Sequence, residues 1–170
     1  MIQEAFEYSE KYGTPVFLRP TTRVCHGYAS IMVKDETEYT HHQPEGFIKD
    51  SKRWVIFPRL SFMNHKKIEA RNQELSDIFS SYEKNTIHPS CDAFKDSKKG
   101  IATGGISYTY TMETLKKTGM VKTLKIATPH AFPEKLAVDF LSGLDEVLCL
   151  EELDPVIERK LIYICGRYHL

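Results

Sequence analysis

The residues from Thr21 to His26 bring hydroxyl, guanidinium, thiol and imidazole groups into one short stretch of the sequence. Together such groups could line a site for an anionic substrate. A catalytic thiolate at Cys25 would need the imidazole of His26 beside it in space, but neighbours on an extended segment face apart. Nucleophilic Cys–His catalysis is therefore disfavoured, and we assign no catalytic residue.

A glycine pair marks a second candidate site. Gly104-Gly105-Ile106-Ser107 follows an expected strand and opens an expected helix. Backbone N–H groups and the positive helix end can hold a phosphate or carboxylate at such a turn. The spacing matches neither GxGxxG nor the GxxxxGK pattern, and glycines are needed here for backbone reasons alone. We favour a tight turn with Ser107 as the helix cap, and keep an anion site at Gly104, Gly105 and Ser107 as the alternative.

Two adjacent carboxylates, Glu151 and Glu152, end a third expected strand. They lie at the edge where open α/β sheets bind their ligands. Paired carboxylates can perform acid–base chemistry when their pKa values differ, but adjacent residues on a strand point to opposite faces. A structural role, capping the following helix or bonding a neighbouring loop, is therefore preferred over catalysis.

No spacing typical of metal ligands is present. The four cysteines are widely separated and form no CxxC pair: Cys25, Cys91, Cys149 and Cys165. This pattern argues against a zinc ribbon, an iron–sulfur cluster and a disulfide scaffold, and favours reduced thiols. His41, His42 and His65 lack a pattern such as HExxH, so we interpret them as surface histidines and expect no metal site.

The elements that must position these residues are clearest after residue 98. Strands are expected at 100–103, 124–127 and 147–150. One helix is expected at 107–117, a second beginning at Pro133, and a third beginning at Asp154-Pro155 with Asp154 as its cap. Three strand–helix pairs predict an α/β fold with an open, mainly parallel sheet and helices on both faces. Because three strands leave exposed edges, a further strand from a missing segment or another chain is expected.

The preceding residues are less regular. Residues 2–12 predict an amphipathic helix, and residues 16–18 predict a buried strand. Together they would form half of an α/β unit. We therefore expect the chain to begin inside a larger domain. A long connection follows, with a short strand possible at 54–57 and an amphipathic helix at about 62–83, capped by Ser61 or Asn64.

Composition limits the function classes. The 170 residues suit one domain, or one domain with a tethered piece of another, and the 41% hydrophobic and 27% charged residues exclude a disordered or collagen-like chain. The 23 basic and 23 acidic residues are evenly distributed, which argues against nucleic-acid binding. With no long apolar run and no leader pattern, we expect a cytoplasmic protein that does not enter membranes.

Several segments together resemble the α subunit of indolepyruvate:ferredoxin oxidoreductases, a family of thiamine-diphosphate-dependent 2-oxoacid oxidoreductases. The likeness covers nearly the whole chain. The third strand with its glutamate pair also looks like the C-terminal domain of transketolase. The segments that carry the resemblance are Tyr12 to His26, Arg53 to Pro58, Gly100 to Tyr108, and Leu124 to Asp154.

The resemblance implies a domain organisation. Residues 1–30 would end a pyrimidine-binding domain, residues 31–97 would be the interdomain linker, and residues 98–170 would form a transketolase-C-like domain that is truncated. In the family, an arylpyruvate is decarboxylated on thiamine diphosphate and oxidised with coenzyme A to an acyl-CoA. Electrons leave through iron–sulfur clusters to ferredoxin. The implied partners are the remaining α-subunit domains, the β subunit and ferredoxin, and a homodimer is compatible with the family.

The departures from the family are as informative as the match. The glutamate that activates the aminopyrimidine, the GDG…N signature for magnesium and diphosphate, and the cysteine-rich cluster domain are all missing. We therefore expect this chain alone to bind none of the parent's cofactors: thiamine diphosphate, magnesium, iron–sulfur clusters and coenzyme A. By motif match, Thr22, Arg23 and His26 correspond to the end of the pyrimidine domain and become candidate site-wall residues, while Cys25 replaces a common serine.

Three hypotheses follow. The first is a fragment of such an α subunit that acts as scaffold and interface and is inactive alone. The second is a free-standing α/β module that binds a small anion or has a regulatory role, using the Gly104-Gly105 turn. The third is a subunit that completes the enzyme in trans.

Overall fold

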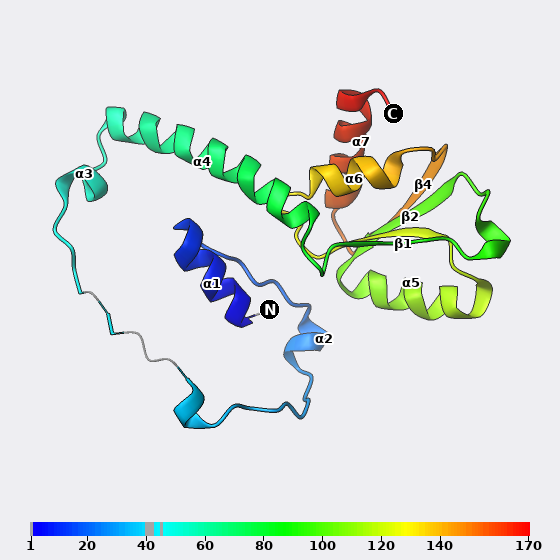
Figure 1. Cartoon of the computed structure of the whole chain (residues 1–170), viewed down its shortest axis with the longest axis horizontal. Coiled ribbons are helices and arrows are strands. Elements are labelled where there is room, and N and C mark those ends of the chain that lie inside the picture. The colour runs from blue at the N-terminus through cyan, green and yellow to red at the C-terminus, as the bar shows by residue number, and fades with distance from the viewer. Residues whose placement is uncertain (1, 40–42, 45) are drawn as a thin grey trace. The chain divides into compact units, whose positions relative to one another are not determined.

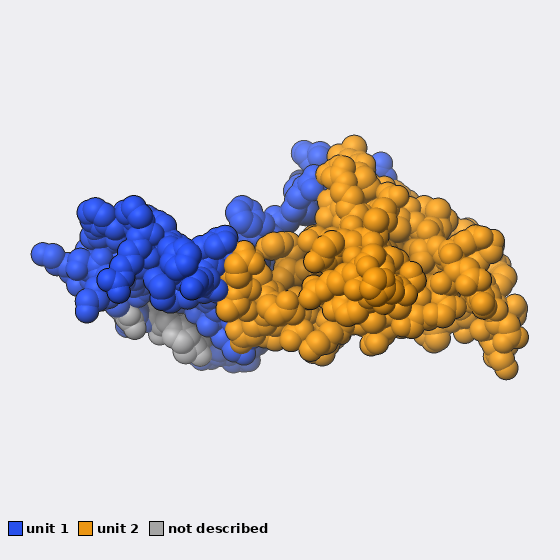
Figure 2. Space-filling model, turned by 90° about the horizontal axis from the view of Figure 1, so that it is seen from above, with its two compact units in different colours: residues 1–68 blue, residues 69–170 orange. Residues whose placement is uncertain are grey.

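The computed structural model describes residues 2–39, 43–44 and 46–170, so that His41 and His42 lie outside the described residues. The chain divides into two compact units, residues 1–68 and residues 69–170, coloured blue and orange in Figure 2. Each unit is described by itself below.

The larger unit is built on a four-stranded sheet. Its strands are β1 Thr86–His88, β2 Lys99–Gly104, β3 Lys122–Ile126 and β4 Glu146–Leu150, in the spatial order β1-β3-β2-β4. β2 pairs in parallel with both β3 and β4, whereas β1 runs antiparallel to β3. The three strands predicted after residue 98 are therefore confirmed, as is their parallel direction.

Helices cover both faces of this sheet. α5 (Gly105–Thr118) joins β2 to β3 on one face, while α6 (Glu134–Leu141) and α7 (Val156–Tyr168) lie on the other (Figure 1). The open, mainly parallel α/β sheet with helices on both faces, predicted from the sequence, is thus what the structure contains. The capping details differ, because Pro155 rather than Asp154 stands at the N-cap of α7.

The apolar core lies between the sheet and the α6–α7 layer. Ala102 and Leu124 pair across β2 and β3, and both are fully buried against this layer. Gly100 on the same face makes room for a large ring, since a Cβ there would lie 2.8 Å from Cζ of Phe140. The buried members of the core are Ala102, Leu124, Ile126, Phe132, Ala137, Phe140, Leu141, Ile157, Leu161 and Ile164.

The fourth strand comes from this chain itself. β1 covers the free side of β3, pairing Ile87 with Leu124, and it lies within residues 31–97, the expected linker. A further strand was expected from a missing segment or another chain, and on this side of the sheet that expectation was wrong, because the chain supplies the strand itself. Three residues are too short to show the alternating pattern that identifies a strand.

The helix predicted at about 62–83 is present as α4 (Pro58–Ser80). It begins at Pro58, where the fixed backbone torsion of proline suits a first turn, so neither Ser61 nor Asn64 caps it. Leu75 and Ser76 near its C-terminal end are buried, and the Ser76 hydroxyl donates a 2.6 Å hydrogen bond to the carbonyl of Phe132. This bond fastens the end of α4 to the loop that precedes α6.

The smaller unit has no core of its own among its described residues. None of those residues is buried, and large apolar side chains are exposed throughout. α1 confirms the predicted first helix. The regular elements that precede α4 in this unit are α1 Ile2–Tyr12, α2 Thr22–Cys25, the 3₁₀ turn η1 Glu36–Glu38 and α3 Ser51–Trp54.

Two predicted strands are absent from this unit. Residues 16–18 form no strand, and the side chain of Phe17 is 91% exposed. Trp54 ends the helical turn α3, which Asp50 caps by accepting the N–H of Lys52, and residues 55–57 form no strand. An apolar run becomes a strand only when a neighbouring strand pairs with it, and the described residues of this unit supply none. Across the described residues, no helix has the length and apolar character needed to cross a membrane.

Candidate functional site at the carboxyl edge of the sheet

The structure brings two of the predicted groups together at the carboxyl edge of the parallel strands. Thr103 of β2 pairs with Leu150 of β4, so the residues that follow them, Gly104 and Glu151, leave neighbouring strands side by side. The hydroxyl of Thr103 donates a 2.8 Å hydrogen bond to the carbonyl of Leu150. This bond joins the two strand ends at the point where a ligand of an open α/β sheet would bind.

The glycine pair is required by the backbone. A Cβ at Gly104 would lie 2.6 Å from the carbonyl oxygen of Ile126, which is closer than real Cβ atoms approach. Gly105 has φ +56°, a left-handed conformation that favours glycine. The favoured interpretation, a tight turn that needs glycine for backbone reasons, agrees with this geometry.

Ser107 does not cap the following helix. α5 already begins at Gly105, with Gly104 at the N-cap position, so Ser107 stands inside the first turn. The carbonyl of Ser107 accepts a 2.8 Å hydrogen bond from the hydroxyl of Thr111. The sequence pattern placed the helix start two residues too late because glycine is a poor helix former. The N-cap residue Gly104 has no side chain with which to cap α5, so within the part of the chain that the structure describes the first-turn N–H groups carry the positive end of the helix dipole without an N-cap side chain.

Glu151 caps a helix. Its two carboxylate oxygens accept the backbone N–H groups of Ile157, at 2.7 Å, and Glu158, at 3.0 Å, in the first turn of α7. This is the capping role that the sequence favoured for one member of the glutamate pair. Glu152 is exposed, and Asp154, the expected cap, instead forms a 3.3 Å ion pair with Arg159.

A cluster that the sequence did not predict lies on the α5 face of the sheet. The Tyr108 hydroxyl is 3.1 Å from Nε2 of His88, and the two rings stack with centroids 5.8 Å apart. The ammonium group of Lys125 lies 4.7 Å from the centroid of the Tyr108 ring. The sequence held no signal for this cluster, because it depends on the pairing of β1 with β3.

Thr22, Arg23 and His26 lie in the smaller unit and are exposed. They occupy the one-turn helix α2 and the residue that ends it, not the extended segment that was expected. Neighbours on a helix do not face each other either, so the geometry still gives Cys25 no partner imidazole at His26. The hydroxyl of Thr21, just before α2, is buried without a hydrogen-bond partner among the described residues.

The environment of the Cys149 thiol at the sheet edge disfavours its thiolate form. Burial, followed by the charges of Glu151 and Glu158, raises the pKa of the Cys149 thiol to about 11, which keeps it protonated near neutral pH. All four cysteines are free. Within the described residues, no three His, Cys, Asp or Glu side chains gather as ligands for a metal ion.

Comparison with known proteins gives one consistent result. Indolepyruvate oxidoreductase subunit IorA of Methanothermobacter thermautotrophicus is 34% identical over 171 residues, which are 99% of this chain and 27% of that subunit. The subunit of the same name from Pyrococcus abyssi is 34% identical over 95% of this chain and 25% of its own length. The one from Archaeoglobus fulgidus is 29% identical over 90% of this chain and 24% of its length.

These relatives confirm the resemblance that the sequence motifs indicated. The chain spans about a quarter of the length of the curated relatives it matches. No family model matches the chain, and no solved structure matches it.

Proposed function

We propose that this chain is a segment of the α subunit of a thiamine-diphosphate-dependent indolepyruvate:ferredoxin oxidoreductase, in which it serves as scaffold and interface. The observation that carries the proposal is the 34% identity to the Methanothermobacter thermautotrophicus subunit over 99% of this chain. The parent enzyme would convert an aryl 2-oxoacid to an acyl-CoA by oxidative decarboxylation. Its further parts would be the remaining α-subunit domains, the β subunit and ferredoxin.

The described residues of this chain do not fit the cofactors of such a parent. Magnesium bound with a diphosphate requires carboxylate ligands, and no suitable group of ligands forms among the described residues. An iron–sulfur cluster requires several thiolates close together, whereas the four cysteines are widely separated in the sequence and gather into no ligand group among the described residues. We therefore assign no cofactor and no catalytic step to this chain, and place both in the rest of the parent.

The geometry of the sheet edge supports a structural role. The Glu151 carboxylate, which could have acted on a substrate, is used by the first turn of α7. The Thr103 hydroxyl is used by the neighbouring strand. Side chains that hold helices and strands in place at this edge are what a scaffold needs.

A second candidate, a free-standing module that binds a small anion, is favoured by one feature, the uncapped N-terminus of α5. A thermal-shift experiment with coenzyme A, thiamine diphosphate and aryl acids separates the two candidates. A ligand at 100 times its dissociation constant would stabilise the chain by about 2.7 kcal/mol. We expect no shift. A saturable shift with any of these ligands would favour the anion-binding module.

Association with the rest of the enzyme tests the first candidate. The tagged chain would be co-expressed with the β subunit of the Methanothermobacter thermautotrophicus relative and with the part of its α subunit that this chain does not match. We expect all three polypeptides to purify together, and a tagged α/β domain of similar size from an unrelated protein to purify alone. A folded chain that never associates would contradict the proposal. Such an assembly would be cytoplasmic, as the widely spaced cysteines also suggest.

Activity of the reconstituted mixture would address the third hypothesis. If the separate polypeptides reduce a dye together with indolepyruvate and coenzyme A, the chain can complete the enzyme in trans. If they associate without activity, the chain requires covalent continuity with its parent. Both results keep the chain in the role of scaffold and interface.

A further inference from the structure

Residues 46–68 carry a concentrated positive charge. They contain six basic side chains and one acidic one, although basic and acidic residues balance over the whole chain. The one acid, Asp50, is used within the segment, where it caps α3 by accepting the N–H of Lys52 at 2.9 Å. All six basic residues are exposed, and none forms an ion pair within the part of the chain that the structure describes. They are Lys49, Lys52, Arg53, Arg59, Lys66 and Lys67.

Exposed apolar side chains lie between these charges. Residues 54–57 form a consecutive apolar run, in which Ile56 is 76% exposed. A solvated basic face needs no large apolar side chains, whereas an apolar surface with a charged rim is typical of an interaction site. The large apolar side chains exposed in the segment are Phe47, Ile48, Trp54, Val55, Ile56, Phe57, Phe62, Met63 and Ile68.

The centre of the segment is ordered around Trp54. Its indole N–H donates a 2.7 Å hydrogen bond to the carbonyl of Ile48. The Phe47 and Trp54 rings stack with centroids 6.3 Å apart, and the Arg53 guanidinium lies 4.6 Å from the centroid of the Trp54 ring. These contacts join residues that are close in sequence. Preorganised tryptophan and arginine side chains lose little conformational freedom on binding, and such residues dominate the energetics of protein interfaces.

We infer that residues 46–68, here called the basic–aromatic segment, are the docking surface for a protein surface that is acidic and has an apolar centre. Its carboxylates would pair with the six cations, and its apolar side chains would cover residues 54–57. The inference rests on the proposed function, since it takes this surface from the parts of the parent enzyme outside these 170 residues. The curated relatives are about four times as long as this chain and so have polypeptide to supply it.

Other occupants fit the segment less well. A second copy in a symmetric dimer would bring the same six cations against each other. A nucleic acid or an anionic membrane attracts proteins through a broad positive field, which a chain of net charge zero lacks. Stacking of nucleic-acid bases also needs a free aromatic face, whereas the Trp54 ring already contacts Phe47 and Arg53.

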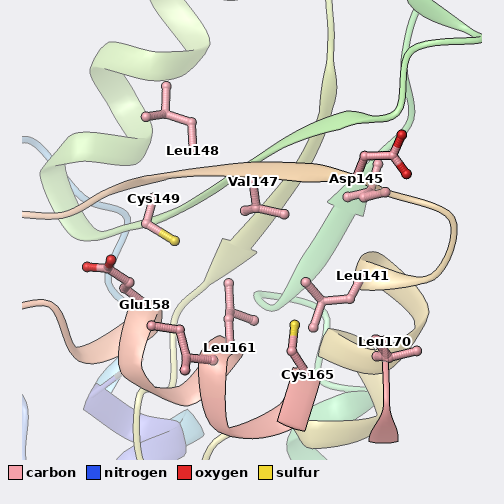
Figure 3. A pocket seen from close by; sticks show the side chains of 11 residues that line it. Leu141, Asp145, Val147, Leu148, Cys149, Glu158, Leu161, Cys165 and Leu170 are labelled. Carbon is pink, nitrogen blue, oxygen red and sulfur yellow. The ribbon is translucent and has the colours of Figure 1, made fainter.

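The groove beside β4 shows the opposite electrostatic character. It has a volume of about 520 Å³ and is lined mainly by apolar and thiol side chains (Figure 3). Among the described residues that line it, the charged ones are Asp145 and Glu158, which are both acidic. An acidic partner would be repelled at this groove. We therefore assign the acidic partner to the basic–aromatic segment and not to the sheet.

Zero-length cross-linking of the co-expressed assembly tests the chemistry of the partner directly. A carbodiimide joins a lysine amine to a carboxylate only where the two groups are in contact. The sample is the full chain purified with the β subunit and the unmatched part of the α subunit of the Methanothermobacter thermautotrophicus relative. We expect Lys49, Lys52, Lys66 or Lys67 to be linked to aspartate or glutamate of those polypeptides. Lys116, which is exposed on α5, should stay unlinked to them.

Charge reversal measures how much the cations contribute. Lys49→Glu with Lys52→Glu should raise the dissociation constant about tenfold or more at about 50 mM salt. The difference should shrink at about 500 mM salt, because salt screens exposed charges. The matched control, Lys116→Glu with Lys117→Glu, makes the same change in charge on exposed residues of α5 and should leave the constant within about twofold. Circular dichroism establishes that both variants fold.

An apolar truncation tests the centre of the surface. Ile56→Ala should weaken association by about fivefold or more, because the partner would lose an apolar contact. The same substitution should leave the urea midpoint of the chain alone unchanged, since the Ile56 side chain is 76% exposed. Unchanged association would show that the apolar run is not part of the docking surface.

A second measurement uses the chain alone. The probes are a random copolymer of glutamate and tyrosine, a single-stranded oligonucleotide and vesicles of phosphatidylserine, compared at equal concentrations of negative charge. We expect the copolymer to slow amide hydrogen exchange at residues 47–57 more than the other two probes do. Stronger protection by the oligonucleotide or by the vesicles would overturn the inference of a protein partner.

Three results in the assembly would overturn the inference: association without cross-links from the segment, equal losses for the two charge reversals, or cross-links that join two copies of this chain through the segment. If the parent polypeptides associate but the segment forms no cross-links, only the inference fails. If the copolymer protects the segment while those polypeptides never associate, the proposed function fails and the acid-binding surface stands. If neither occurs, both fail.

Discussion

Side chains at the carboxyl edge of the sheet hold backbone groups. Glu151 shows this most clearly, because both of its carboxylate oxygens accept N–H groups of α7. Without such acceptors, the first N–H groups of a helix would have to find water or another cap. Glu151 therefore contributes to stability, and its effect can be measured by substitution.

Replacing Glu151 by glutamine should destabilise the fold by about 1 kcal/mol, because the charge at the positive end of α7 and one of two strong acceptors are lost. Urea unfolding followed by circular dichroism measures the change. Glu152→Gln is the matched control, since Glu152 is exposed and should change stability little. Equal losses for the two variants would contradict the capping role.

Thiol reactivity gives a second prediction for single residues. The pKa of Cys149 is raised to about 11, so its reactive thiolate should be scarce at about pH 8 and increase only as the pH approaches 11. Cys25 is exposed and should react first with iodoacetamide. Mass spectrometry of alkylated peptides over a pH series measures both rates. If Cys149 reacted as fast as Cys25 near pH 8, the assignment of a protonated, protected thiol would be wrong.

At this scale the sequence predicted roles better than exact positions. It favoured a capping role within the glutamate pair, and Glu151 performs it. The sequence pattern predicted Ser107 as the cap, but the helix begins two residues earlier, at Gly105. Gly105 has a left-handed backbone conformation that most other residues avoid, and glycine adopts it readily. The site-wall role of Thr22, Arg23 and His26 stays a prediction.

Among the elements, the junction of α4, β1 and β3 depends on one buried amide. Asn85 lies just before β1, and its amide NH₂ donates to the carbonyl of Phe79 at 2.9 Å and to the hydroxyl of Thr128 at 2.7 Å. Its amide oxygen accepts the N–H groups of Ala127, at 2.7 Å, and Thr128. One side chain thus satisfies backbone groups from the end of α4 and the end of β3.

Asn85→Ala should therefore destabilise the chain by about 3 kcal/mol, because several buried polar groups would lose their partners at once. Ser80→Ala is the control, since that hydroxyl only bonds the carbonyl of Ser76 in its own helix and should cost about 0.5 kcal/mol or less. Denaturant titration measures both. A loss for Asn85→Ala no greater than for the control would show that β1 is held by other contacts.

The elements that the sequence predicted correctly are those with strong local signals. β2, β3 and β4 lie between turn residues and helices, and each overlaps the range expected for it. β1 escaped prediction because three residues show no period. The predictions of strands at 16–18 and 54–57 were wrong because a local signal was present without a partner. The apolar residues there suggested burial, but the described residues include no strand that pairs with them.

For the whole molecule, stability is concentrated in residues 69–170. The hydrophobic core lies entirely within that unit, and no described residue before it is buried. Segments with few buried contacts open easily and are cleaved first by proteases. The exposed apolar residues of the smaller unit are what an interface with a larger assembly would cover.

Limited trypsin digestion of the full chain should therefore cut first after Lys34, Lys49, Lys52 or Arg53 and leave a product that retains residues 69–170. Mass spectrometry identifies the order of cleavage. Cleavage first within β2 or β3 would contradict the location of the core. In the reconstituted assembly the early sites should be protected, which links this measurement to the proposed interface.

The central claim is that this chain supplies structure to an enzyme whose reacting groups lie elsewhere. The most direct measurement is anaerobic reduction of a viologen dye by the purified chain alone, given indolepyruvate, coenzyme A, thiamine diphosphate and magnesium. We predict a rate no higher than that of the mixture without protein. Sustained, indolepyruvate-dependent reduction that scales with the amount of chain would contradict the claim.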